Sequence, residues 1–264
     1  PGHYISALEA SSSSRTSGET FLHELTIVEA PLPQNLLSLE AQGDQFWNAQ
    51  KYEEAREAYE QELAQQRELS ANPAATAALL NKFGSLLLGQ GEYETAQAYY
   101  EEALAIRQEV LKPNHPDTAS TLRSLSYLLQ RQEKYEAALP YLEQAYAIHR
   151  ELWGDNDEDT ILTMYTLGNL LQLAGDYEAA QSRLEQALAI VRKIEGAERD
   201  LGNILHYLGT LWLAQDQYEQ ARPYLEEALA IRREDWGEDD PKTAETRTKL
   251  EQLAQQQATT ETAV

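Results

Sequence analysis

The sequence contains no cysteine, few phenylalanines and no long apolar run. Because none of the 264 residues is cysteine, no disulfide and no thiolate metal site can form, which fits a reducing compartment. No run of about 18 apolar residues is present, so no segment is expected to span a membrane. The first residues also lack the basic and apolar stretches of a signal peptide. We therefore expect a cytoplasmic protein without membrane insertion.

Basic residues are also scarce, and this limits the partners. The chain has 21 Lys and Arg against 44 Asp and Glu, a net charge of −23. Such an acidic protein repels phosphate backbones and anionic membrane surfaces, so we expect no nucleic-acid partner. Solubility alone is a sufficient reason for the charge. Glycine and proline are sparse, at 13 and 9 residues, which favours helices.

The chain repeats itself at a nearly constant interval. Five tyrosines, spaced 41, 42, 42 and 41 residues apart, mark the repeats: Tyr52, Tyr93, Tyr135, Tyr177 and Tyr218. A small residue stands nine positions before each tyrosine: Gly43, Gly84, Ser126, Gly168 and Gly209. An alanine stands ten positions after each of the last four: Ala103, Ala145, Ala187 and Ala228. Apolar residues recur at helical spacing on both sides of the tyrosine, which predicts two closely crossing helices in each repeat.

This order of small residue, tyrosine and alanine resembles the tetratricopeptide repeat (TPR). It argues against the HEAT and armadillo classes, whose repeats have a similar length. The long unit, with Ala-Leu-Ala-Ile-Arg at 103–107 and His-Pro-Asp-Thr at 115–118, is similar to the kinesin-light-chain type. The resemblance implies an all-α, right-handed superhelical solenoid of five helix-turn-helix repeats plus a C-terminal cap helix. The expected repeats are about 36–73, 74–115, 116–157, 158–199 and 200–240, followed by a cap helix at 242–257.

The two ends of the chain fall outside this array, which we place at residues 34–257. Residues 1–33 form an N-terminal arm that we expect to be partly flexible, since 11–18 is rich in serine. Within the arm, residues 21–33 mix apolar residues with Glu24 and Glu29. We expect this segment to dock on the groove of its own or a neighbouring chain, or to cover the first repeat. Residues 258–264 are expected to be a disordered tail.

No constellation for catalysis is visible, and we expect neither an enzyme nor a cofactor. The five histidines include no pair at helical ligand spacing, so no metal site is expected: His3, His23, His115, His149 and His206. No phosphate-binding loop, dinucleotide motif or nucleophile elbow appears. The run 155–159 begins like a calcium loop but lacks its glycine and glutamate. We interpret it as a solvated loop in which Asp159 or Thr160 caps the next helix.

The resemblance implies that the first helix of each repeat lines a concave groove. Outward positions lie about 12, 8, 5 and 4 residues before each tyrosine, and in repeats two to five they hold no acidic residue. Amides can bond a peptide backbone, arginine can bind carboxylates, and tyrosine offers broad contact. The same residues could also simply face water. The candidate peptide-binding residues are Asn81, Ser85, Arg123, Tyr127, Gln130, Arg131, Tyr165, Asn169, Gln172 and His206.

The expected function is therefore that of a protein–protein interaction scaffold or adaptor. Its partner would be an extended segment, acidic or mixed acidic and apolar, bound in the concave groove. One alternative is a self-assembling structural module joined through its ends or its arm. Another is a peptide-regulated effector similar to bacterial quorum-sensing TPR proteins, although no output domain is evident.

Overall fold

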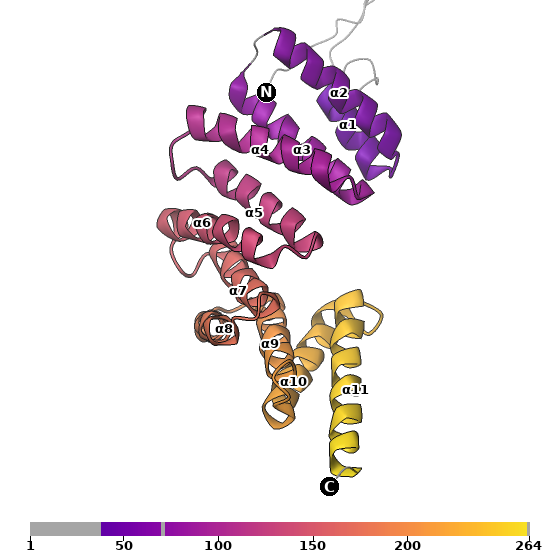
Figure 1. The fold of residues 1–264 in the computed structure, drawn as a ribbon, viewed down its shortest axis with the longest axis vertical. Coiled ribbons are helices and arrows are strands. Elements are labelled where there is room, and N and C mark those ends of the chain that lie inside the picture. Colours follow the sequence, from indigo (N-terminus) through magenta and orange to yellow (C-terminus); the bar gives the residue numbers. More distant parts are fainter. Residues whose placement is uncertain (1–37, 70–71, 263–264) are drawn as a thin grey trace, which may run out of the picture. The chain divides into compact units, whose positions relative to one another are not determined.

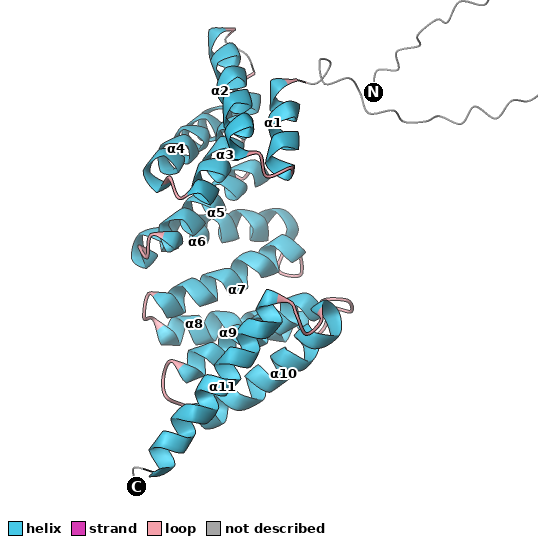
Figure 2. Ribbon diagram, turned by 90° about the vertical axis from the view of Figure 1, so that its right-hand side faces the viewer, coloured by secondary structure: helices cyan, strands magenta, loops and turns pink. Residues whose placement is uncertain are grey.

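The computed structural model describes residues 38–69 and 72–262, and in these ranges it contains helices and no strand (Figure 1, Figure 2). The arm at 1–33, with its proposed docking segment 21–33, lies outside the described residues. The described part of the chain forms eleven helices: α1 Leu39–Asn48, α2 Tyr52–Glu68, α3 Pro73–Gln90, α4 Tyr93–Val110, α5 Pro116–Arg131, α6 Tyr135–Trp153, α7 Glu158–Leu173, α8 Tyr177–Val191, α9 Glu198–Leu213, α10 Tyr218–Trp236 and α11 Pro241–Thr262.

Consecutive helices pair into five hairpins, and the hairpins stack in chain order with α11 at the C-terminal end (Figure 1). This arrangement confirms the all-α, repeat-solenoid prediction. Two borders lie slightly earlier than predicted, since α3 begins at Pro73 and α9 at Glu198. The last helix also extends to Thr262, so the backbone of residues 258–262, expected in a disordered tail, continues the helix.

The two helices of a repeat cross closely at the small residue that precedes the tyrosine. A Cβ atom built on Gly84 would lie 2.8 Å from the ring of Tyr100, and one on Gly168 would lie 2.6 Å from Cγ of Leu184. A large side chain would overpack this crossing, whereas repeat three accommodates the small Ser126 there. The alanines three and ten residues after the tyrosines complete the interface and are fully buried in repeats two to five: Ala96, Ala103, Ala138, Ala145, Ala180, Ala187, Ala221 and Ala228.

The turn inside each repeat requires a left-handed backbone two residues before the tyrosine. Glycine meets this need in repeats two and four, with φ of 81° at Gly91 and 87° at Gly175. The other three repeats hold a larger residue there, each with φ of 58°: Gln50, Glu133 and Asp216. These three positions carry a conformational cost that glycine avoids.

The loop before α7 supplies its own helix cap. Asp157 Oδ1 accepts a hydrogen bond from the backbone N–H of Thr160 at 3.2 Å. The predicted caps, Asp159 and Thr160, therefore need correction. Asp159 instead lies in the first turn of α7, where its carboxylate pairs with Arg123 of α5 at 3.3 Å.

Buried polar side chains join most of the successive repeats. Arg107 is only 5% exposed, and its Nη1 donates to the carbonyl oxygen of Asp117 at 2.5 Å and to the hydroxyl of Thr121 in the next repeat. We call such a contact a polar latch. It recurs fourteen residues after the tyrosine in two further repeats, as His149 with Asp159 and Thr163, and as Arg232 with Lys242 and Thr246.

The junction between repeats four and five has no polar latch. Val191 occupies the position of the buried arginine, and Ile204 occupies the position of the threonine five residues before the small residue. Helix α8 is also shorter, with 15 residues against 18 in α4 and 19 in α6. Glu195 consequently stands in a loop at the repeat position that Trp153 and Trp236 fill at the ends of α6 and α10.

Candidate peptide-binding site

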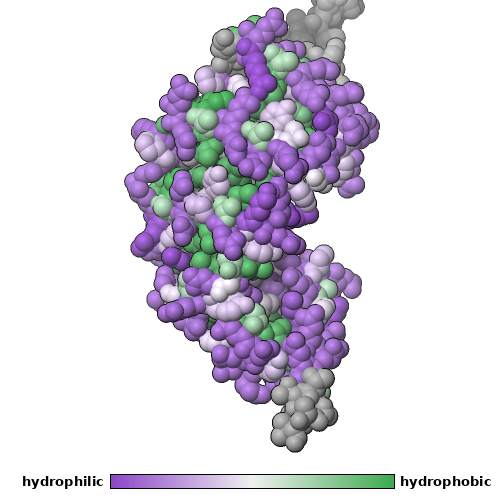
Figure 3. Space-filling model, in the orientation of Figure 1, coloured by the Kyte–Doolittle hydropathy of each residue, from purple (hydrophilic) through white to green (hydrophobic). Residues whose placement is uncertain are grey.

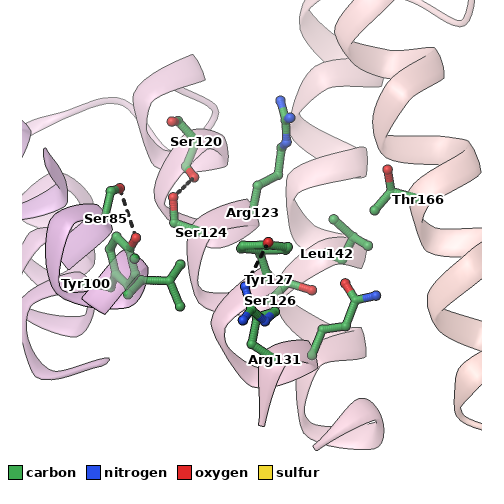
Figure 4. Close-up of a pocket in the computed structure, with 13 residues that line it drawn as sticks. Ser85, Tyr100, Ser120, Arg123, Ser124, Ser126, Tyr127, Arg131, Leu142 and Thr166 are labelled. Carbon is green, nitrogen blue, oxygen red and sulfur yellow. Dashed lines mark hydrogen bonds between the residues drawn. The ribbon is translucent and has the colours of Figure 1, made fainter. Parts of the chain in front are cut away.

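A cavity of about 530 Å³ opens between α3, α5 and α7 (Figure 4). Figure 4 shows Tyr127 at its centre, with Ser85 and Tyr100 on one side and Leu142 and Thr166 on the other. Five of the ten predicted residues line this cavity: Ser85, Arg123, Tyr127, Gln130 and Arg131. The sequence prediction therefore identifies one cavity on the first helices of repeats two and three.

The cavity is free of acidic residues and contains two arginines. Arg131 donates to the hydroxyl groups of Tyr127 and Tyr93, both at 3.4 Å. Among the residues that the structure describes, no carboxylate pairs with Arg131, whereas Arg123 pairs with Asp159. The cavity is thus a locally basic site on a chain of net charge −23.

Hydroxyl groups and one open aromatic ring supply the remaining contacts. Ser85 Oγ lies 2.9 Å from the hydroxyl of the buried Tyr100. Burial raises the pKa of Tyr100, which keeps its phenol neutral. Tyr127 is 50% exposed, and its ring therefore offers a face to a ligand. Arg131 has no carboxylate partner to displace, so the site has room for a carboxylate beside an apolar group that packs on Tyr127.

The other predicted residues on the surface of α3 and α7 lie outside the main cavity. Asn81 lines, with Ser85, a smaller cavity of about 300 Å³ beside Trp47. Asn169 and Gln172 are half-buried, and the amide oxygen of Gln172 accepts a hydrogen bond from Thr210 at 3.5 Å. These three residues extend the first-helix face on both sides of the main cavity.

Two predicted residues are buried and cannot contact a partner directly as placed. His206 is 2% exposed because α11 covers this part of α9, and its Nδ1 lies 3.1 Å from the hydroxyl of Thr246. Its predicted surface role therefore needs correction: the cap helix uses the groove position for packing. Tyr165 is 5% exposed, and its hydroxyl accepts from Asn203 at 3.4 Å.

Sequence reasoning missed the serines and the opposite wall of the cavity. Ser120 and Ser124 lie on the same helical face as Tyr127 and Arg131, at spacings of four, three and four residues. That spacing was visible in the sequence and would have added Ser124 and extended the site by about one turn, to Ser120. Leu142 and Thr166 carry no such signal, since they join the cavity only through the packing of successive repeats.

The face of the molecule seen in Figure 3 is mainly polar, with apolar patches along its middle. Within the described ranges, no helix is long and apolar enough to cross a membrane. The same part of the chain contains no group of three His, Asp or Glu side chains suited to a metal ion.

Stacked helical hairpins with a cavity on their first helices define a solenoid of the interaction-scaffold class. A sequence model of the tetratricopeptide repeat matches residues 35–109, 75–151, 125–193 and 200–264. The chain therefore belongs to the tetratricopeptide-repeat family. A search of curated proteins gave no match.

Solved structures of similar fold include proteins related to kinesin light chain. BtubC (BKLC) from P. vanneervenii is 24% identical with a TM-score of 0.66, over 74% of this chain and 78% of that one. A putative kinesin light chain of Podosopora anserina is 22% identical with a TM-score of 0.67, over 75% and 95%. YrrB, described as a TPR protein with an unusual peptide-binding site, is 17% identical with a TM-score of 0.52, over 75% and 86%.

Proposed function

We propose that this chain is an interaction scaffold that binds an extended, acidic or mixed acidic–apolar protein segment across its first helices. The binding site is the cavity around Tyr127, and the compartment is the cytoplasm. The observation that carries the proposal is a cavity with two arginines and no acid on a strongly acidic protein. Charge complementarity selects the partner, because acidic segments are repelled by the rest of the chain.

Arg131 is the main anchor for a carboxylate. A guanidinium has five N–H donors in a planar fork, and two long bonds to tyrosine hydroxyls leave donors for a bidentate contact. Arg123 is a weaker anchor, because Asp159 already neutralises part of its charge. The ring of Tyr127 lies between the two arginines and can pack against an apolar side chain of the segment (Figure 4).

An extended segment suits this face better than a compact ligand. Ser85 lines both the main cavity and the smaller cavity beside Trp47, so the two are neighbours along the first helices. Extended chain advances about 3.3 Å per residue, so a segment of six to eight residues would cover about 20–26 Å. The description of YrrB as a peptide-binding TPR protein supports peptide recognition on a similar fold.

The chain's own residues 21–33 fit this ligand class by sequence, with Glu24 and Glu29 among apolar residues. We therefore propose them as a competing occupant, in the same or a neighbouring molecule. A chain starting at Gln34 should then bind a labelled peptide of sequence 21–33 more tightly than the full chain does. If self-assembly is the function instead, light scattering should show oligomers that the deletion dissociates.

The test is charge reversal in the cavity, with the peptide of sequence 21–33 as the probe. Arg123→Glu with Arg131→Glu should weaken binding at least tenfold, since each charge-assisted bond contributes about 1.5–3 kcal/mol. The matched control is Lys51→Glu with Lys112→Glu, which changes the net charge equally at two exposed sites outside the cavity. Equal binding by both double variants would exclude the cavity as the site.

A further inference from the structure

A second cavity, of about 710 Å³, opens where the repeat pattern is broken. It lies between the first halves of α7 and α9 and the start of α11, beside the loop that replaces the last turn of α8. In the third and fifth repeats a tryptophan ends the second helix at this point, whereas here Glu195 stands in the loop. The shortened helix leaves the space open.

The floor of this cavity is apolar, and the carboxyl group of Asp200 lies among its apolar side chains. Ile161, Leu162, Ile194 and Trp236 provide the apolar surface. Asp200, in the first turn of α9, is half-buried, and its neighbour on the cavity wall is the buried hydroxyl of Tyr165. Burial raises the pKa of Asp200 against the opposing effects of the Tyr165 hydroxyl and the charge of Lys242, so a further cation in the cavity would stabilise its charged form.

Charge at this cavity is opposite to that of the first. Glu158, Glu195 and Asp200 line it, and within the described part of the chain none of them has an ion-pair partner. Asp240 also lines it, but its carboxylate caps α11 by accepting from the N–H of Lys242 at 2.8 Å.

The two basic residues at its rim are already engaged. Arg199 Nε pairs with Asp235 at 2.8 Å, and the ammonium group of Lys242 lies over the ring of Trp236, 4.8 Å from its centroid. Lys242 keeps its positive charge in this contact, so the lining carries four carboxylates against two basic groups, and the net charge that faces a ligand is negative.

The two cavities are adjacent across a single helix. Thr166 lines the first cavity and its neighbour Tyr165 lines the second, both on α7. The pair of Arg123 and Asp159 bridges α5 and α7 between them. One extended segment that passes over α7 would therefore meet arginines on one side and carboxylates on the other.

We propose that the second cavity receives a basic side chain, arginine or lysine, together with an adjacent apolar side chain of the same bound segment. The inference rests on the proposed function, which assigns the acidic part of that segment to the first cavity. The preferred ligand is then bipolar, with an acidic–apolar part over α5 and a basic–apolar part over α7 and α9. The opposite charges of the two cavities fix the direction in which the segment binds.

The probes are four fluorescein-labelled peptides measured against the full chain. One contains glutamate and leucine, one contains arginine and leucine, and two join these halves through glycines in the two possible orders. One bipolar order should bind at least tenfold tighter than the glutamate–leucine peptide, and the other order should not. Glu158→Gln with Asp200→Asn should abolish this gain while leaving the binding of the glutamate–leucine peptide unchanged.

The control variant carries Glu94→Gln with Glu136→Gln, two exposed residues outside both cavities, and should keep the gain. Glu158→Gln alone carries the test if the Asp200 variant unfolds, as judged by circular dichroism. Binding of the glutamate–leucine peptide without a gain in either order would overturn this inference and leave the proposed function intact. Failure of that peptide to bind at all would overturn both.

Discussion

Four of the five junctions along the array fall into two kinds, while the first, between repeats one and two, has Gln66 and Leu79 at the corresponding positions. Where repeat two meets three, three meets four, and five meets α11, a buried arginine or histidine reaches a carbonyl and a threonine hydroxyl of the next element. Where repeat four meets five, Val191 and Ile204 are buried instead. At these four junctions the same backbone repeat is thus joined either by hydrogen bonds or by apolar packing, and both partners change together.

The two kinds of junction differ in how strictly they fix the docking of one repeat on the next. A buried polar group must be matched by its partner or it costs free energy, whereas apolar contact tolerates shifts in register. The polar latches therefore fix how successive repeats dock. The apolar junction coincides with the shortened α8 and with the second cavity, so the array departs from its own pattern at the place where a new site opens.

The largest expected effect comes from breaking a polar latch. Arg107→Val removes the guanidinium that donates to the hydroxyl of Thr121 and to the carbonyl of Asp117, and should lower the free energy of unfolding by about 2–3 kcal/mol. Adding Thr121→Ile converts the junction to the apolar kind and should restore at least half of the loss. Urea unfolding of both variants measures this. Equal destabilisation by the single and the double variant would contradict the equivalence of the two junctions.

The close crossing of the two helices inside each repeat is the same whichever kind of junction follows it. Gly168→Leu should overpack α7 against Leu184 and lower the free energy of unfolding by about 1–3 kcal/mol. Glu178→Ala, on the exposed side of α8, should cost far less. Similar shifts of the melting temperature for these two variants would show that the glycine is not at the crossing.

The latch formed by His149 should make stability depend on pH. Burial, aided by the positive charge of Arg123, lowers the pKa of His149, and burial also lowers that of His206. The unfolded chain then takes up protons first, so stability is full above about pH 6.5 and is lost as the pH falls below it. Each histidine contributes up to about 1.4 kcal/mol per pH unit in that range.

His149→Arg copies the residue found in the other two latches and removes this titration. Urea unfolding between pH 7.5 and 5.5 should show a smaller loss of stability for this variant than for the unaltered chain. His206, whose pKa is also lowered by burial, contributes to the loss that remains. An unchanged pH profile would mean that His149 does not titrate within the junction.

The smallest effect concerns the turns. Glu133→Gly should raise the free energy of unfolding by about 0.5 kcal/mol, because residue 133 has φ of 58° and glycine adopts this region without strain. Glu136→Gly, in the first turn of α6, is the control and should destabilise. Thermal melting would detect the difference. A loss of stability for both variants would show that the turn is held by contacts of the Glu133 side chain.

The repeat pattern made the fold predictable, because each tyrosine, small residue and alanine recurs where two helices must touch. The site was predictable only in part. Arg123, Tyr127 and Arg131 lie on one cavity, since a single helix presents them at regular spacing, and their binding of a peptide stays a prediction. His206 was misjudged because its exposure depends on α11, which packs over it from outside the repeat. Neighbouring elements, rather than local spacing, decide such positions.

The polar latches and the second cavity could not be predicted from the sequence either. Arg107 and Thr121 lie 14 residues apart and belong to different helices, so no helical period connects them. The loop at Glu195 occupies the repeat position of a tryptophan, but only the structure shows that the missing turn leaves a cavity there.

The central claim, that an acidic–apolar segment lies in the cavity around Tyr127, can be tested by photo-crosslinking. A benzophenone side chain placed at position 127 should crosslink to a peptide of sequence 21–33 on irradiation, and an excess of unlabelled peptide should suppress the product. The same group at position 177, an exposed tyrosine on α8 outside this cavity, is the control and should give little product. Equal crosslinking from both positions, or none from position 127 while the peptide still binds, would contradict the account.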